Sequence, residues 1–230
     1  YFKQLFAALK LLGYKKPLKH LGYEFVTLPD GAMASRKGNI ITLQDFLARA
    51  NELAKNEVVA RHKDEWNDGK IEHAAWCVAM GGVMFAMLKQ DPEKPIVFDM
   101  TKALAFEGDT GPYVQYAATR LTSILEKAKN EDKSLTLAER TRKNRNFEGV
   151  DMSVLDHDAE KRLAFVLAQL PEYVERASAE YKPSIIAQWC LEAAEVVNAF
   201  YRDVKILDTK KEEVKLARLR LISAAKIALQ

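Results

Sequence analysis

The stretch PDGAMASRKGN (residues 29–39) combines two glycines with two adjacent cations, a combination suited to holding a polyphosphate. Gly31 and Gly38 let the backbone adopt positive φ angles and bring its N–H groups close to an anion. Arg36 and Lys37 place two positive charges just before a predicted helix, where they can neutralise negative charge that develops in a transition state. By itself the loop is a weak signal, because a solvated cationic turn has the same composition.

A second group of chemistry-bearing residues lies on a predicted helix that begins near Pro112. Tyr113, Tyr116 and Arg120 are spaced i, i+3 and i+7, so they share one face of that helix, and Gln115 lies beside them. Aromatic rings that stack on bases, next to a cation that contacts phosphate, form a typical RNA-binding surface. The alternative is that the two tyrosines are core residues that anchor the helix to the preceding segment.

Composition limits the class of protein. The chain has 230 residues, of which 48% are hydrophobic and 29% charged, with a net charge of +3, as expected of a soluble globular protein. No apolar stretch is long enough to predict a membrane span. Cys77 and Cys190 lie in apolar helical patterns and are predicted to be buried free thiols, which fits a reducing, cytoplasmic compartment. No metal site is predicted.

Periodicity predicts a mainly α protein, with a small mixed α/β segment to about residue 110 followed by an antiparallel helical bundle. Short strands are predicted at residues 23–28 and 95–99. Thr42 is the expected N-cap of a helix that starts near residue 43. Residues 71–90 are apolar nearly all round and predict a buried helix, in which the Gly81–Gly82 pair indicates a close helix contact or a kink. Helices are also predicted at residues 2–12, 112–128, 155–177 with a break at Pro171, 183–204 and 214–228, and residues 130–150 are read as a linker.

Three segments together resemble the arginyl-tRNA synthetases, a family of class I aminoacyl-tRNA synthetases. DGAMASRKGNIITLQDFL (residues 30–47) is similar to that family's DGKMSxRKGN form of the KMSKS loop. IVFDMTKALAFEGDTGPYVQYAATRLTSIL (residues 96–125) resembles its EGNTGPYxQYAHARIxSI segment, and residues 170–207 resemble helices of its anticodon-binding bundle. The resemblance covers residues 20 to 230 and implies a C-terminal remnant of a Rossmann-type catalytic domain (1–110) followed by a helical anticodon-binding domain (111–230).

The resemblance also implies residue roles in the loop. Met33, Ser35, Arg36, Lys37 and Gly38 match the family's ATP-closing loop, with Arg36 and Lys37 as the catalytic cations. The usual first lysine of that loop is replaced by Ala32, and the small serine that follows is replaced by Ala34. Charge that acts only in the transition state is expected to affect turnover more than ATP binding.

The same resemblance implies a tRNA-binding bundle. Asn198, Tyr201 and Arg202 match the family's N-x-F-Y pattern and are expected, with Tyr113, Gln115, Tyr116 and Arg120, to contact tRNA; packing by Phe200 and Tyr201 is the alternative. The implied partners are tRNA(Arg), ATP with magnesium, and arginine, in a monomeric enzyme.

The second class I motif, HIGH, has no match in the chain. HLGY (residues 20–23) lies about ten residues before the loop, at the entry to a predicted strand, whereas HIGH belongs at a helix N-terminus. The sequence therefore predicts part of an arginine–tRNA ligase that does not form aminoacyl-adenylate alone. The alternatives are a stand-alone helical tRNA-binding module, a part of another class I enzyme such as the cysteinyl one, or a helical interaction domain unrelated to RNA.

Overall fold

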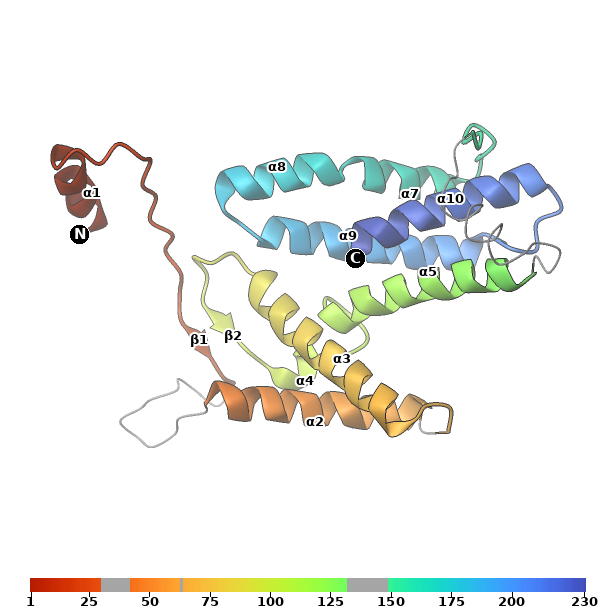
Figure 1. The fold of residues 1–230 in the computed structure, drawn as a ribbon, viewed down its shortest axis with the longest axis horizontal. Coiled ribbons are helices and arrows are strands. Elements are labelled where there is room, and N and C mark those ends of the chain that lie inside the picture. The colour runs from red at the N-terminus through yellow and green to blue at the C-terminus, as the bar shows by residue number, and fades with distance from the viewer. Residues whose placement is uncertain (30–41, 63, 132–148) are drawn as a thin grey trace.

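The computed structural model describes residues 1–29, 42–62, 64–131 and 149–230. The described part of the chain is mainly α, with two short strands, as the sequence predicts (Figure 1). Its elements in chain order are α1 (Phe2–Leu11), β1 (Val26–Thr27), α2 (Leu43–His62), α3 (Asp68–Leu88), β2 (Ile96–Val97), α4 (Met100–Ala103), α5 (Gly111–Glu131), α7 (Asp158–Ala168), α8 (Leu170–Glu180), α9 (Ser184–Asp203) and α10 (Glu212–Leu229).

The two strands form a small parallel sheet. Val26 pairs with Ile96 and Thr27 with Val97, and β1 is shorter than the strand predicted over residues 23–28. Parallel neighbours need a crossover connection, and here it contains the antiparallel helix pair α2 and α3 (Figure 1). The N-terminus of α2 is fixed as predicted, because the Asp45 N–H donates to the Thr42 hydroxyl at 3.1 Å.

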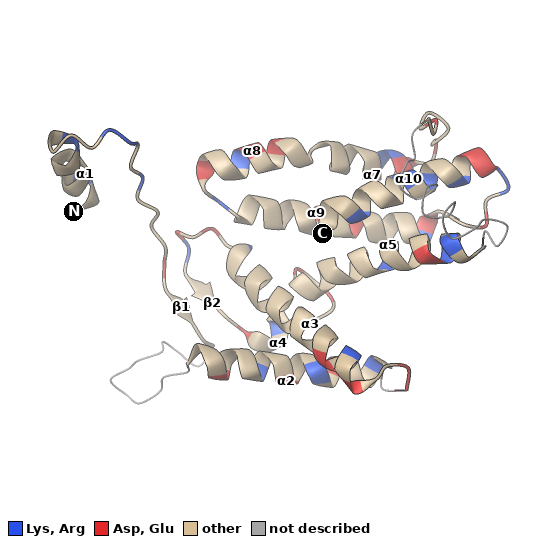
Figure 2. Cartoon of the chain, viewed as in Figure 1, with Lys and Arg blue, Asp and Glu red and all other residues tan. Residues whose placement is uncertain are grey.

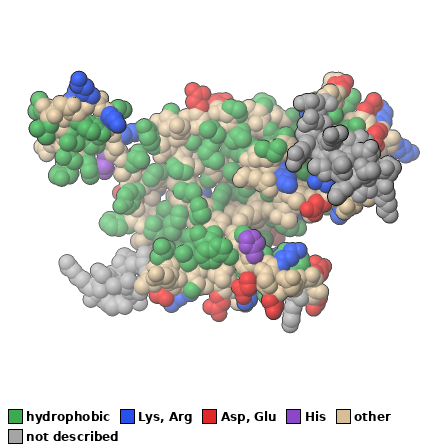
Figure 3. All heavy atoms as spheres, viewed as in Figure 1, with side chains coloured by type: hydrophobic (Ala, Val, Ile, Leu, Met, Phe, Trp, Pro, Cys, Tyr) green, Lys and Arg blue, Asp and Glu red, His purple; other side chains and the backbone are tan. Residues whose placement is uncertain are grey.

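Helix α3 is buried on one face only, which corrects the prediction of burial nearly all round. Ile71, Ala75, Ala79 and Val83 are buried against its neighbours, whereas Trp76, Met84 and Leu88 are exposed. Figure 3 shows hydrophobic side chains on the surface over α1 and over the middle of the molecule, where α3 crosses. By length and composition alone, α3 is apolar enough to cross a membrane, but in the structure it packs against α2, α4 and α5. Its composition predicted burial, but the structure leaves its outer face to solvent.

The join between α3 and α5 depends on glycine. A Cβ at Gly111 would lie 2.3 Å from the carbonyl oxygen of Gly81, so the two backbones touch with no room for a methyl group. A Cβ at Gly82 would lie 2.9 Å from the carbonyl oxygen of Ala103. The predicted close contact at Gly81–Gly82 is thus confirmed, and it seats the first turn of α5 directly on α3.

Helices α5, α7, α8, α9 and α10 form an antiparallel bundle, as predicted (Figure 1). The long helix predicted over residues 155–177 is broken next to Pro171, where α7 ends and α8 begins, because proline cannot donate the backbone hydrogen bond that a continuous helix requires. The Trp189 indole donates to the carbonyl oxygen of Val166 at 3.0 Å. The largest side chains buried in the bundle are Leu121, Leu163, Trp189, Phe200 and Ile222.

Glu160 and Arg218 form a charged pair inside the bundle. Glu160 is 1% exposed and accepts from Arg218 Nε at 2.5 Å. Its other carboxylate oxygen accepts the His157 N–H at 2.9 Å, and His157 Nδ1 accepts the Ala159 N–H, which completes the capping box of α7. This pair links α10 to the start of α7. Both charged groups have hydrogen-bond partners, which offsets the free-energy cost of burying them.

The cysteine prediction is wrong for Cys77. The Cys77 side chain is exposed on the outer face of α3, with its sulfur 3.7 Å from Nε2 of His73. Cys190 is half-buried, and burial raises the pKa of its thiol. Hydrophobic neighbours in the sequence predicted burial at Cys77, but that residue lies on the solvent side of a helix buried on one face only.

Candidate RNA-binding site

The predicted loop residues Met33, Ser35, Arg36, Lys37 and Gly38 lie outside the described residues. The described elements nearest to them in sequence are β1 and α2, which carries the confirmed Thr42 cap. Their roles therefore remain predictions.

Four of the predicted RNA-binding residues meet on the bundle, at the contact between α5 and α9. Tyr116 and Arg120 lie one helical turn apart on α5, and Asn198 and Tyr201 come from α9. Arg120 Nη1 donates to Asn198 Oδ1 at 2.6 Å, and Nη2 donates to the Tyr116 hydroxyl at 3.2 Å. We call Tyr116, Arg120, Asn198 and Tyr201 the Arg120 cluster.

The guanidinium of Arg120 also lies over two aromatic rings. Its Cζ is 4.3 Å from the ring centroid of Tyr116 and 5.1 Å from that of Tyr201. Because the guanidinium is planar and carries five donors, these contacts fix its orientation. The cluster thus has a fixed cation between two tyrosines that remain exposed, at 42% for Tyr116 and 46% for Tyr201.

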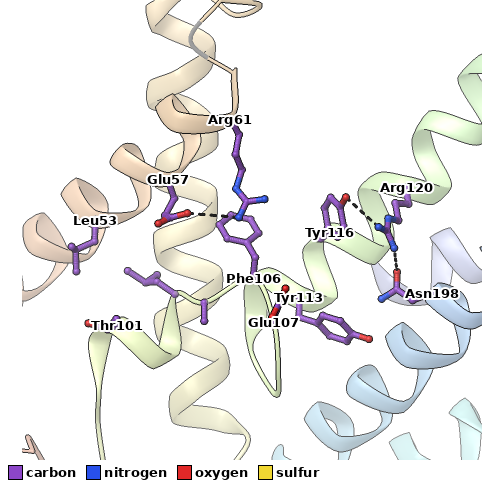
Figure 4. A pocket seen from close by; sticks show the side chains of 12 residues that line it. Leu53, Glu57, Arg61, Thr101, Phe106, Glu107, Tyr113, Tyr116, Arg120 and Asn198 are labelled. Atoms are coloured by element: carbon purple, nitrogen blue, oxygen red, sulfur yellow. Dashed lines mark hydrogen bonds and ion pairs between the residues drawn. The ribbon is translucent and has the colours of Figure 1, made fainter.

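The cluster borders an open cleft of about 750 Å³ between the bundle and the N-terminal half of the chain (Figure 4). Helix α2 and the segment after α4 form one side, and α5 and α9 form the other. The lining residues are Leu53, Glu57, Arg61, Thr101, Leu104, Ala105, Phe106, Glu107, Tyr113, Tyr116, Arg120 and Asn198.

The other predicted residues take different positions. Tyr113 is half-buried. It packs against the bundle core, as expected of a core residue, and it also lines the cleft, where an RNA-contacting residue would lie. The Gln115 amide donates to the Cys77 carbonyl oxygen at 2.9 Å and thereby joins α5 to α3. Arg202 pairs with the neighbouring Asp203, with 2.8 Å between Nε and Oδ1, and lies outside the cluster.

Sequence reasoning missed the α2 side of the cleft. Arg61 Cζ lies 4.4 Å from the ring centroid of Phe106, and Nη2 of Arg61 lies 3.7 Å from Oε2 of Glu57. Arg61 and Phe106 are far apart in the sequence, and Arg61 lies outside the three segments that carry the family resemblance. Only the spacing of Glu57 and Arg61 at i and i+4 on one helix gave a local signal.

Charge alone does not mark the site. Figure 2 shows Lys and Arg interspersed with Asp and Glu along the helices. With a net charge of only +3, the overall field gives little attraction for a polyanion. Binding of RNA would therefore depend on local groups such as the Arg120 cluster.

Comparison with known proteins identifies the bundle. Residues 114–230 match the DALR anticodon binding domain, and residues 1–100 match the catalytic domain of class I tRNA synthetases (R). The chain is 35% identical to the arginine–tRNA ligase of Bdellovibrio bacteriovorus over 232 aligned positions, which span all of this chain and 38% of that protein. The chain belongs to the arginyl-tRNA synthetase family. It is also 38% identical to the arginine–tRNA ligase of Methanocella arvoryzae, over 99% of this chain and 37% of that enzyme.

Solved structures of arginyl-tRNA synthetases show the same fold. The Thermus thermophilus enzyme superposes with a TM-score of 0.75 at 32% identity, over 91% of this chain and 33% of that one. The Plasmodium falciparum enzyme gives the same TM-score at 19% identity, over 99% of this chain and 36% of that one, and shows the fold alone. The chain thus spans between a third and two fifths of the length of these relatives.

Proposed function

We propose that the chain serves as part of an arginine–tRNA ligase, which attaches arginine to tRNA(Arg) at the expense of ATP. Residues 1–110 would supply the C-terminal piece of the catalytic domain with its ATP-closing loop, and residues 111–230 the anticodon-binding domain. The observation that carries this proposal is the Arg120 cluster, because it places a fixed cation and two exposed tyrosines on a bundle of the anticodon-binding family.

The cluster suits unpaired RNA. Exposed aromatic rings can stack on bases that are not paired in a helix, and the guanidinium can contact the adjoining phosphate. Asn198 holds the guanidinium in place before RNA arrives, so less conformational entropy is lost on binding. Tyr113, Gln115 and Arg202 would extend this surface, with Gln115 acting by holding α5 on α3.

For the loop, we propose that Arg36 and Lys37 contact the triphosphate of ATP, with Met33, Ser35 and Gly38 shaping the backbone around it. The proposal rests on the sequence match of the loop and on the match of residues 1–100 to the class I catalytic domain. Magnesium would accompany the ATP. We propose a monomer in the cytoplasm with tRNA(Arg), ATP and arginine as its partners and with no membrane attachment.

Filter binding of labelled tRNA(Arg) to this chain, against bulk RNA as competitor, tests the tRNA-binding part. We expect tRNA(Arg) to bind more tightly than bulk RNA. About three phosphate contacts would make its affinity fall about twentyfold between about 50 and 200 mM salt. Equal binding of both RNAs, or no binding at the lower salt concentration, would refute the proposal.

A further inference from the structure

The α2 side of the cleft carries a second stacking surface, separate from the Arg120 cluster, which we call the Arg61–Phe106 platform. The Arg61 guanidinium lies over the Phe106 ring at 4.4 Å, and Glu57 lies one helical turn before Arg61 (Figure 4). Guanidinium planes and aromatic rings are both surfaces on which single-stranded bases stack. A base placed on the outer side of Arg61 would therefore rest on a cation supported by an aromatic ring.

The charges around this platform exclude a phosphate from its centre. Arg61 and Arg120 lie on opposite sides of the cleft, and the carboxylates of Glu57 and Glu107 also line it. A phosphate lying next to Glu57 would meet a like charge, whereas a neutral group that donates hydrogen bonds would not. The two arginines are thus suited to flanking phosphates, and the space between them to a neutral base.

The lining of the cleft supports the same conclusion. It is formed in part by the apolar side chains of Leu104 and Ala105, and a volume of about 750 Å³ lies within the range of small-molecule sites. The lining combines these apolar groups with polar and charged ones, so a flat group with apolar faces and polar edges fits it better than a chain of phosphates does.

We propose that this cleft binds one unstacked nucleobase that carries an exocyclic amine, with the base stacked on Arg61 and its amine donating to Glu57. This inference rests on the RNA binding proposed above, and it states which kind of base the α2 side of the same cleft selects. A carboxylate is only an acceptor, so it favours an amino group and repels a carbonyl group at the same position. A correct pairing of this kind contributes about 1–3 kcal/mol of discrimination between bases.

The test uses two RNA hairpins with one stem sequence, one with a loop of adenosines and the other with a loop of purine riboside, which lacks only the amine. Fluorescence anisotropy with the full chain should show about tenfold tighter binding of the adenosine loop. Glu57→Ala should reduce this ratio to less than about twofold, because alanine leaves the amine without an acceptor at this position. Glu52→Ala, on the same helix outside the cleft, should leave the ratio unchanged.

The possible outcomes separate this inference from the proposal on which it rests. If wild-type protein binds both hairpins equally, or if Glu57→Ala keeps the full ratio, the base pocket is refuted while RNA binding stands. If neither hairpin binds and tRNA(Arg) does not bind either, both proposals fail. Loss of the Glu57–Arg61 pair does not threaten the fold, since an exposed pair one helical turn apart contributes at most about 0.5 kcal/mol.

Discussion

Replacing Arg120 by alanine should weaken binding of tRNA(Arg) about thirtyfold, which corresponds to about 2 kcal/mol. The substitution removes the cation from between Tyr116 and Tyr201 and leaves Asn198 without its donor. Both tyrosines then lose the contact that orders them, so stacking on RNA weakens together with the phosphate contact. Titration of labelled tRNA(Arg) with each variant measures the effect.

The chain offers a matched control on α8. Arg176 lies over the ring of Tyr173 at 5.0 Å, so it is also an arginine stacked on a tyrosine, but it lies on α8 rather than at the α5–α9 contact. Arg176→Ala should change the affinity less than about twofold. Arg120→Lys keeps the charge but not the planar fork, so it should recover only part of the loss. Equal losses for Arg120→Ala and Arg176→Ala would show that charge alone explains binding.

Replacing Gly111 by alanine should destabilise the protein by about 2–3 kcal/mol, because the new methyl group overlaps backbone. Its Cβ would lie 2.3 Å from the Gly81 carbonyl oxygen and 2.9 Å from Cβ of Phe85, and neither atom can rotate away. Helices α3 and α5 must move apart, and the Gln115–Cys77 hydrogen bond lies at the same contact. Thermal unfolding should show a midpoint lower by about 6 °C.

Gly69→Ala provides the comparison for this prediction. Gly69 lies in the first turn of α3, and its nearest neighbour would be 3.7 Å from the new Cβ, an ordinary contact. Alanine favours the helix by up to about 1 kcal/mol, so the midpoint should stay the same or rise slightly. A Gly111→Ala protein as stable as Gly69→Ala would contradict the close contact between α3 and α5.

The sequence predicted the features that local chemistry determines. Pro171 breaks a helix wherever it lies in the interior of one, and Thr42 caps α2 through its own hydroxyl, so both were predicted from neighbouring residues. The spacing of Tyr116 and Arg120 placed them on one helix face without any knowledge of the fold.

Other features depend on packing between distant segments. Asn198 reaches Arg120 only because α9 packs on α5, and Arg61 reaches Phe106 only because the segment after α4 returns to α2. The family resemblance supplied Asn198, but no sequence pattern supplied Arg61. The error at Cys77 came from composition, which does not show that α3 has neighbours on only some of its sides.

Hydroxyl-radical footprinting of exposed tyrosines tests most directly whether the Arg120 cluster is the RNA-binding surface. Tyr116, Tyr201 and Tyr181 start from similar exposures of 42%, 46% and 49%, and Tyr181 lies at the far end of α8. When tRNA(Arg) is added at saturation, the oxidation of Tyr116 and Tyr201 should fall severalfold while that of Tyr181 stays constant. Bound tRNA that leaves Tyr116 and Tyr201 as reactive as before, or that protects Tyr181 instead, would contradict the account.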